Sequence, residues 1–406
     1  MAEQLERVVG VPGAVLMGLG SILGTGIFVG VGLAAGVAGA WVLPALALAA
    51  LVAACNGLSS AQLAAAFPVS GGTYEYGHRV LSRPFGLVAG WTFLIAKSAS
   101  AATAALGFAG YALAVRGGGG AGAQLGLALA AVLVMTAVVA DGLRRSNRTN
   151  AVIVSITIAA LAAFVIAGLP HARAGAAHLD PLWRGQDPGG LLRAAALLFV
   201  AFTGYGRIAT LGEEVREPAR SIPRAIVIAL VLTTIIYAAV AVVALCAAGP
   251  RTLAAATAST AAPLEDVASR FDAAWVGRVV AGGAITAMLG VLLNLLLGLS
   301  RVVLAMARRG DLPRGLAAVD ARRSSPVRAV LVVGAVIATL VVIRDVKLTW
   351  TVSAFTVLVY YAITNLAALR LPAEQRRYPR AIAVVGLLGC LALGAAILAP
   401  GADLVR

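Results

Sequence analysis

The sequence is poor in charge and in cysteine, and each shortage excludes a class of protein. Only 12% of its 406 residues are charged, whereas 61% are apolar. Soluble domains carry about twice that charged fraction, so an ordinary soluble fold is excluded. The three cysteines lie far apart inside apolar stretches, without the spacing of a disulfide framework or a zinc site. We therefore expect small buried cysteines, no metal site and no cofactor.

Acidic residues are also scarce, with 17 against 32 basic ones and a net charge of +15. A basic excess of this size usually indicates a nucleic-acid partner. Here the arginines are single residues between long uncharged runs, and they do not form a patch on a polar surface. We expect no nucleic-acid partner, and the lipid bilayer is the predicted surroundings of the chain.

Long apolar runs are the dominant feature. A helix needs about 20 apolar residues to cross a hydrocarbon core of about 30 Å. The chain as a whole, 1–406, is predicted to be one all-α polytopic membrane domain with about 11 spans. The predicted spans fall near residues 11–36, 41–66, 86–114, 123–143, 150–169, 191–212, 225–248, 276–306, 327–343, 348–370 and 381–399.

The positions of the basic residues predict the orientation. Cytoplasmic loops of membrane proteins retain Lys and Arg. With the N-terminus inside, 20 of the 32 basic residues fall on the inner side and ten on the outer side or at the C-terminal end. We therefore expect a multi-pass protein of the cell membrane with a cytoplasmic N-terminus. Lys97 and Arg207 belong to neither set of loops.

Glycines interrupt the first predicted span. Gly20, Gly24 and Gly26 fall at mid-membrane within the run from Gly18 to Gly30. Each glycine weakens a helix by about 1 kcal/mol relative to alanine, and unwound backbone is tolerated in a bilayer only where it lines a cavity or is buried in protein. The pattern is consistent with a break beside a binding site. For this segment alone, GxxxG pairs that let two helices pack closely are the better interpretation.

The sixth predicted span carries a second interruption. Gly204 and Gly206 lie beside aromatic residues in the run from Phe199 to Gly206, five spans after the first. Matching Gly-interrupted segments in two halves indicate a secondary transporter built from inverted repeats. Broken helix ends offer N–H donors to an anion and carbonyls to a cation, which suits an α-amino acid. Because the middle of every predicted span lacks Asp and Glu, a neutral substrate side chain is favoured.

Other function classes lack their residues in these spans. A membrane-embedded enzyme needs a nucleophile with its base, a carboxylate pair or metal ligands at membrane depth, and the sequence offers none, so we expect no catalytic residues. A channel needs a polar or charged ring along its pore. A channel and a non-transporting amino-acid sensor are the alternatives from a different class.

Four motifs, in order along the chain, resemble those of the amino acid, polyamine and organocation (APC) superfamily of permeases. They are Gly20–Phe28 (GSILGTGIF), Pro68–Tyr74 (PVSGGTY), Gly212–Arg224 (GEEVREPARSIPR) and Ser300–Pro313 (SRVVLAMARRGDLP). The resemblance covers essentially the whole chain. It implies two inverted five-helix repeats with broken helices 1 and 6, where family members usually carry twelve spans. The implied units are residues 8–170, residues 190–370 and an additional C-terminal helix at 380–400.

The resemblance also implies roles at the two breaks. The first break would meet the substrate carboxylate and the sixth span its amino group. An aromatic residue, Phe199 or Phe202, would close the outer gate, because the usual gate position holds Val200. Some proton-coupled relatives replace sodium with a lysine at the position of Thr157. The implied substrate-binding residues are Ser21, Ile22, Leu23, Gly24, Thr25 and Gly26 in the first span, and Phe202, Thr203, Gly204, Tyr205 and Gly206 in the sixth.

Three kinds of charged residue need an explanation. Lys97 falls inside the third span, where a cation costs roughly 3 kcal/mol, so it is expected to face the bundle interior. A lysine in low dielectric releases its proton readily, which suits coupling to protons; a structural lysine is the alternative. Arg207 either contacts an anionic substrate or pairs with Glu214. Glu213 and Glu214 indicate a cytoplasmic ion-pair gate or a solvated helix end.

Together these features predict a secondary active transporter that moves amino acids by alternating access. Neutral amino acids are the favoured substrates, with proton coupling or exchange, and a proton or sodium is the expected coupling ion. Transporters of polyamines, cationic amino acids or acidic amino acids are the alternatives within the class.

Overall fold

Helices follow the predicted apolar runs closely. The computed structural model describes residues 9–67, 71–142, 147–183, 188–209, 215–273, 275–320 and 325–399. In these ranges the only strand-type pairings are two isolated bridges, Val9 with Val215 and Asp320 with Ser325. The all-α prediction is therefore confirmed.

The first predicted span consists of three pieces, and the remaining spans are mostly single helices. The pieces are α1 (Val11–Ile22), the π-helix η1 (Gly26–Gly30) and α2 (Val31–Ala38). The other long helices are α3 (Val42–Ala66), α5 (Arg83–Val115), α6 (Ala121–Ala140), α7 (Asn147–Ala174), α8 (Pro188–Phe202), α10 (Pro218–Thr260), α12 (Trp275–Arg309), α13 (Val327–Ile343), α14 (Val346–Leu369) and α15 (Arg380–Leu398).

Short elements connect these helices. Two follow α3, namely α4 (Thr73–Tyr76) and the π-helix η3 (Gly77–Leu81), and two follow α8, namely the 3-10 turn η5 (Thr203–Tyr205) and α9 (Gly206–Ala209). The remaining ones are η2 (Gly39–Trp41), η4 (Ala176–Trp183), α11 (Pro263–Ala268), η6 (Arg314–Ala317) and η7 (Ala373–Gln375).

The span count agrees with the sequence. Among the described residues, nine helical segments are long and apolar enough to cross a membrane, and α13, with 17 residues, is a shorter apolar helix. One of the nine, Val11–Ala66, has 56 residues and contains the first two predicted spans. The helix α10 runs beyond its predicted end at 248, but Gly249 has a non-helical φ of 76° and Pro250 follows it. The regular helix therefore stops where the apolar run does.

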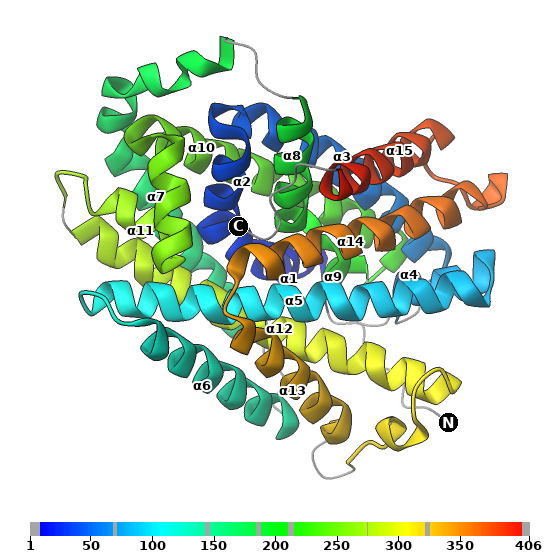
Figure 1. Ribbon diagram of the computed structural model, residues 1–406. Helices are drawn as coiled ribbons and strands as arrows, with labels where there is room; N and C mark the ends of the chain where they lie inside the picture. The colour runs from blue at the N-terminus through cyan, green and yellow to red at the C-terminus, as the bar shows by residue number, and fades with distance from the viewer. Residues whose placement is uncertain are drawn as a thin grey trace.

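The helices pack in two groups around the long helix α5. In Figure 1, α5 crosses the molecule, and it packs against both α14 and α12. One apolar cluster is formed mainly by α1, α2, α3, α8, α10 and α14. A second joins α5, α6 and α13 to the C-terminal half of α12. The broken segments α1 and α8 thus belong to the first cluster, and α5 and α12 contribute residues to both clusters.

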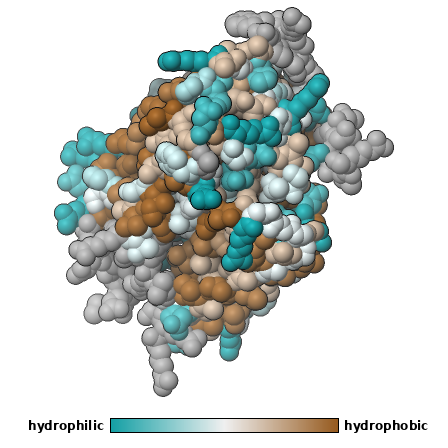
Figure 2. All heavy atoms as spheres, turned by 90° about the vertical axis from the view of Figure 1, so that its left-hand side faces the viewer, coloured by the Kyte–Doolittle hydropathy of each residue, from teal (hydrophilic) through white to brown (hydrophobic). Residues whose placement is uncertain are grey.

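The surface fits a lipid environment. Large apolar side chains are more than half exposed on four outer helices: Leu133, Ile166, Ile235 and Leu388. Figure 2 looks onto the end of the bundle that lies at the left of Figure 1, where hydrophilic residues are interspersed with apolar ones. Soluble monomers rarely expose so much apolar surface, whereas lipid tails match it. The chain is a multi-pass membrane protein.

Candidate functional site

The first helix breaks at its glycines. The helix α1 ends at Ile22, Leu23 adopts an extended conformation with φ −74° and ψ 99°, and helical structure resumes with η1 at Gly26. A Cβ on Gly26 would lie 2.6 Å from Cα of Ala201 in α8. Glycine is therefore needed here because another backbone passes so closely. The predicted break in the first span is confirmed.

The sixth span breaks directly beside the break in the first span. The helix α8 ends at Phe202, the chain makes the 3-10 turn η5, and α9 begins at Gly206. A Cβ on Gly204 would lie 2.5 Å from the carbonyl carbon of Ser21. The two breaks therefore touch each other, and the prediction of a broken sixth span is also confirmed.

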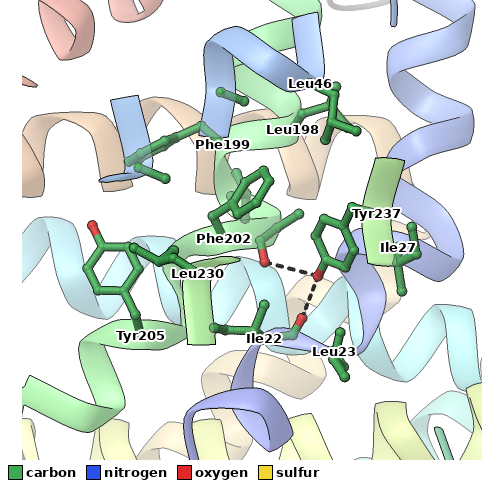
Figure 3. Close-up of a cluster of buried hydrophobic side chains, with 14 of the residues drawn as sticks. Ile22, Leu23, Ile27, Leu46, Leu198, Phe199, Phe202, Tyr205, Leu230 and Tyr237 are labelled. Carbon is green, nitrogen blue, oxygen red and sulfur yellow. Dashed lines mark hydrogen bonds between the residues drawn. The ribbon is translucent and has the colours of Figure 1, made fainter. Parts of the chain in front are cut away.

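Tyr237 of α10 bridges the two breaks. Its hydroxyl lies 2.8 Å from the carbonyl oxygen of Ile22 and 3.2 Å from that of Ala201, and the dashed lines in Figure 3 mark both contacts. Its ring packs beside Phe202, with ring centroids 5.3 Å apart. One buried hydroxyl thus lies within hydrogen-bond distance of carbonyl oxygens at the ends of both broken helices.

A cavity of about 180 Å³ lies beside the breaks. The hydroxyl of Thr25 is buried at its wall and has no hydrogen-bond partner among the described residues. A buried polar group of this kind is rare in proteins without a ligand or water to serve it. The cavity therefore has the character of a binding site. Nine of the residues predicted for substrate binding, coupling or gating line it, namely Ser21, Ile22, Thr25, Gly26, Lys97, Thr203, Gly204, Gly206 and Arg207.

The other predicted residues lie elsewhere. Phe199 and Tyr205 are buried and each packs against Tyr361, with centroids 5.7 Å and 5.4 Å apart. Thr157 is buried and bonds the carbonyl of Ile153 within its own helix. Leu23, Gly24 and Phe202 are buried at the breaks but do not belong to the cavity wall. Glu213 and Glu214 lie outside the residues that the structure describes.

Sequence reasoning missed most of the aromatic wall. The cavity is lined by Tyr74, Phe93, Trp350, Tyr360 and Tyr361. Tyr74 belongs to one of the four motifs, and a tyrosine pair inside an apolar span is a further signal that could have been noticed. Which helix face points inward depends on packing, however, and the sequence periodicity of α14 does not give it.

Lys97 joins α5 to the sixth span. Its Nζ donates a hydrogen bond to the Thr203 hydroxyl at 2.8 Å, and that hydroxyl donates to the carbonyl of Val200 at 2.8 Å. The lysine is buried, as expected from its cost in the membrane interior. Lys97 therefore makes direct contact with the turn at the break in the sixth span.

The charges at the cavity have one sign. Lys97, Arg207 and Arg301 belong to its wall, and within the described ranges no Asp or Glu does. No three His, Cys, Asp or Glu side chains of the described residues gather closely enough to hold a metal ion. The wall therefore suits a neutral or anionic ligand better than a cation.

One end of the cavity is tightly packed, and we name it the closed end. The Trp350 indole N–H donates to the carbonyl of Leu197 at 2.9 Å. The hydroxyls of Ser100 and Ser353 lie 2.7 Å apart, and those of Thr103 and Thr349 lie 2.8 Å apart. All four hydroxyl side chains are buried. Neutral hydrogen bonds between α5 and α14 thus seal this end.

The opposite end, named the open end, reaches solvent. Arg301 is exposed there, and Gly206, Arg207, Val302 and Ala305 are partly exposed. The difference in exposure shows that the cavity is accessible from this side.

Ion pairs surround the open end. Glu75 receives hydrogen bonds from Arg79 at 3.1 Å and from Arg309 at 2.6 Å. Asp311 receives one from the Tyr74 hydroxyl at 2.7 Å and one from Arg83 at 3.1 Å. Burial disfavours the charged form of Asp311, but these two bonds, together with attraction to the charges of Arg83 and His78, outweigh it, so the pKa of Asp311 lies below its ordinary value.

A helical membrane domain with two touching helix breaks beside a cavity that opens at one end is the architecture of a transport protein. The chain belongs to the amino acid permease family, whose family model matches residues 9–403. The predicted resemblance to the APC superfamily is thereby confirmed.

Individual relatives support the assignment. An uncharacterized transporter of Mycobacterium tuberculosis is 46% identical over 97% of this chain and 87% of the relative. The branched-chain amino acid permease BcaP of Bacillus subtilis is 28% identical over 80% of this chain and 72% of its own length. The vacuolar cationic amino acid transporter 2 of Arabidopsis thaliana is 27% identical over 94% of this chain and 62% of its own length. These names cover more than one substrate class.

Proposed function

We propose that the protein is a secondary active transporter that carries amino acids across the cell membrane by alternating access. The observation that carries the proposal is the cavity beside the two breaks, accessible from one end and sealed at the other. Alternating access requires a central site that is exposed to one side at a time.

The first break supplies a site for the substrate carboxylate. The N–H groups of Thr25 and Gly26 stand at the start of the renewed helix, where intrahelical acceptors are lacking and the helix dipole is positive. The buried Thr25 hydroxyl and the Ser21 hydroxyl lie at the same wall. The turn from Phe202 to Gly206 is the proposed site for the amino group.

Neutral amino acids are the favoured substrates. The wall is largely aromatic and aliphatic, which suits an uncharged side chain. The lack of a carboxylate at the described wall argues against polyamines and cationic amino acids. Acidic amino acids are the second candidate, because Lys97, Arg207 and Arg301 offer three positive charges.

Lys97 is proposed as the coupling residue. Its protonated amine bonds Thr203 at the sixth-span break, and loss of the proton would change that contact. With a cytoplasmic N-terminus, the open end faces the cytoplasm, and the structure corresponds to the inward-open state. Phe199, Phe202, Arg207, Glu213 and Glu214 stay proposed gate residues, and Thr157 a proposed position beside the coupling site.

The transport proposal is tested with purified protein. Ligand-induced thermal shifts across all amino acids and several polyamines identify the ligand class, and counterflow into proteoliposomes tests transport. We expect saturable counterflow of at least one neutral amino acid. Binding without counterflow would indicate a sensor, and conductance without saturation a channel.

The coupling proposal is tested with Lys97→Gln. Uptake by this variant is expected to lose its pH dependence while substrate binding persists, because no proton is left to exchange at residue 97. Lys347→Gln is the matched control, since Lys347 is the other lysine in the chain and lies near the start of α14. Unchanged pH dependence in Lys97→Gln would refute the role of Lys97.

A further inference from the structure

Two asparagines meet inside the helix bundle, away from the cavity. Asn56 of α3 and Asn365 of α14 are completely buried, and the Asn365 Nδ2 donates to the Asn56 Oδ1 at 2.6 Å. The Asn56 Nδ2 donates in turn to the Sγ of Cys390 in α15 at 3.2 Å. We name these three residues the amide cluster, and none of them lines the cavity. An amide inside an apolar helix needs partners of this kind, because burial without a hydrogen bond is costly.

The hydrogen bonds of the amide cluster run in one direction. The Asn365 Nδ2 also donates to the main-chain carbonyl of Tyr361, one turn earlier in α14, at 3.0 Å. Because a carbonyl only accepts, the NH₂ group of Asn365 must face both Tyr361 and the Asn56 oxygen. The NH₂ group of Asn56 is thereby turned toward Cys390. The cluster therefore fixes the Asn365 amide in one orientation.

Tyr361 connects the amide cluster to the break in the sixth span. Its side chain lines the cavity, and its hydroxyl donates to the carbonyl oxygen of Thr203 at 3.3 Å. Thr203 is also the residue whose hydroxyl accepts the hydrogen bond of Lys97. The cluster, Tyr361 and Thr203 thus form one chain of contacts from α15 to the proposed site for the substrate amino group.

Gly386 brings the backbone of α15 against both amides. A Cβ at Gly386 would lie 2.7 Å from the Asn365 Oδ1 and 2.8 Å from the Asn56 Oδ1. Glycine is therefore needed where the two amides approach the helix so closely. The α15 backbone limits the space in which the amide pair can move.

One atom of the cluster distinguishes it from a contact that only holds helices together. The Asn365 Oδ1 is buried and has no hydrogen-bond partner among the described residues. Buried polar atoms of this kind are rare, and proteins keep such local costs mainly at functional sites. Asn365 keeps its orientation because the opposite one would turn its oxygen toward the Tyr361 carbonyl. The amide thus serves the position of Tyr361 and leaves its own oxygen unpaired.

We propose that Asn365, oriented by Asn56 and Cys390, is a positioning residue that holds Tyr361 against the break in the sixth span. The helix α15, which lies outside the two predicted five-helix repeats, thereby helps to shape the substrate site. The inference rests on the proposed transport function and adds a determinant of substrate affinity to it.

The first experiment is a double-mutant cycle with Asn365→Leu and Tyr361→Phe. The substrate is the neutral amino acid that gives the largest thermal shift with the wild type, and counterflow into proteoliposomes gives its KM and maximal rate. Each single variant is expected to raise KM about two- to tenfold, the effect of one lost hydrogen bond, at an unchanged maximal rate. The affinity falls because the substrate must itself order a turn that is no longer held in place.

The double variant is expected to raise KM no further than the larger single effect, because Asn365 acts through Tyr361. If the two single effects multiply, the inference is overturned, since a purely structural Asn365 acts independently of the Tyr361 hydroxyl. Absence of counterflow in the wild type would instead refute the transport proposal. Thr356→Val is the matched control in α14, because the Thr356 hydroxyl bonds the Val352 carbonyl within the same helix. Its KM should equal that of the wild type.

The second experiment tests the part of α15 and leaves the amides unchanged. Gly386→Ala places a Cβ against both amide oxygens, so the amides must shift, and KM is expected to rise as in Asn365→Leu. Gly394→Ala in the same helix is the control, because an added Cβ there meets nothing within 4 Å. Equal KM values in the two folded glycine variants would contradict the role of α15.

Discussion

The closed end and the open end of the cavity are held by different chemistry. At the closed end, hydroxyl pairs such as Ser100 with Ser353, and the indole of Trp350, make neutral hydrogen bonds in a buried setting. At the open end, Glu75 and Asp311 make hydrogen bonds with arginines whose side chains are 39% to 71% exposed. The buried closed end is thus held without charged groups, whereas the solvent-exposed open end is held by ion pairs.

This difference bears on how the closed end would open in the proposed alternating-access cycle. A neutral hydrogen bond contributes about 0.5–1.5 kcal/mol net, because water replaces it when the partners separate. Ion pairs buried at the same place would cost several kcal/mol to desolvate. A few hydroxyl pairs therefore seal the closed end with a small barrier. The close backbone contacts of the glycines, rather than charges, decide how tightly α1 and α8 approach.

The largest effect is expected from a methyl group at the contact between the two helix breaks. In Gly26→Ala the new Cβ collides with the Ala201 backbone, 2.6 Å from its Cα, so α1 and α8 must separate. Because overpacking of this kind costs about 1–3 kcal/mol, or about 5- to 150-fold in an equilibrium constant, we expect amino-acid counterflow to fall by about tenfold or more.

The control for this substitution is Gly282→Ala in α12, where an added Cβ meets nothing within 4 Å. It should leave counterflow unchanged. Equal activity of the two variants would show that the contact between α1 and α8 does not set the geometry of the site.

A smaller effect is expected from Asp311→Asn at the open end. The lowered pKa of Asp311 stabilises the folded protein above the ordinary pKa of 3.8, and that contribution is lost as the pH falls through the folded value. We expect Asp311→Asn to lose about 1 kcal/mol at neutral pH and to show a shallower loss of stability in acid. Thermal unfolding in detergent between about pH 3 and pH 7 measures both.

Asp272→Asn serves as the comparison for Asp311→Asn, because the Asp272 side chain is 98% exposed and lies 3.7 Å from His171. Its stability should match the wild type at every pH. A loss of stability as large as that of Asp311→Asn would mean that the hydrogen bonds of Asp311 contribute no more to stability than the contacts of an exposed carboxylate do.

The breaks could be predicted from sequence because their cause is local. Glycine clusters weaken a helix wherever they stand, and Lys97 had to face inward because lipid excludes its charge. The aromatic wall of the cavity could not be predicted from sequence. Whether Trp350 and Tyr361 face the cavity depends on how α14 is rotated against α5 and α8. Phe199, an expected gate residue, packs behind the cavity wall against Tyr361 for the same reason.

Asn56 and Asn365 were missed for a different reason. A search for charges passes over neutral amides, although an asparagine inside an apolar helix must also find a partner. Only the fold shows that they bond each other and that Cys390 of α15 joins them. Gly20, in contrast, was singled out by the sequence, and the structure adds that Asn150 fills the space beside it.

Alternating access is tested most directly by locking the closed end. The Ser100 and Ser353 hydroxyl oxygens are 2.7 Å apart, so Ser100→Cys/Ser353→Cys should form a disulfide on oxidation, in a background where the three buried native cysteines are replaced by alanine. Counterflow is expected to disappear in the oxidised double variant, to return on reduction, and to persist in both single variants. Unchanged counterflow with the disulfide formed would contradict alternating access through this end.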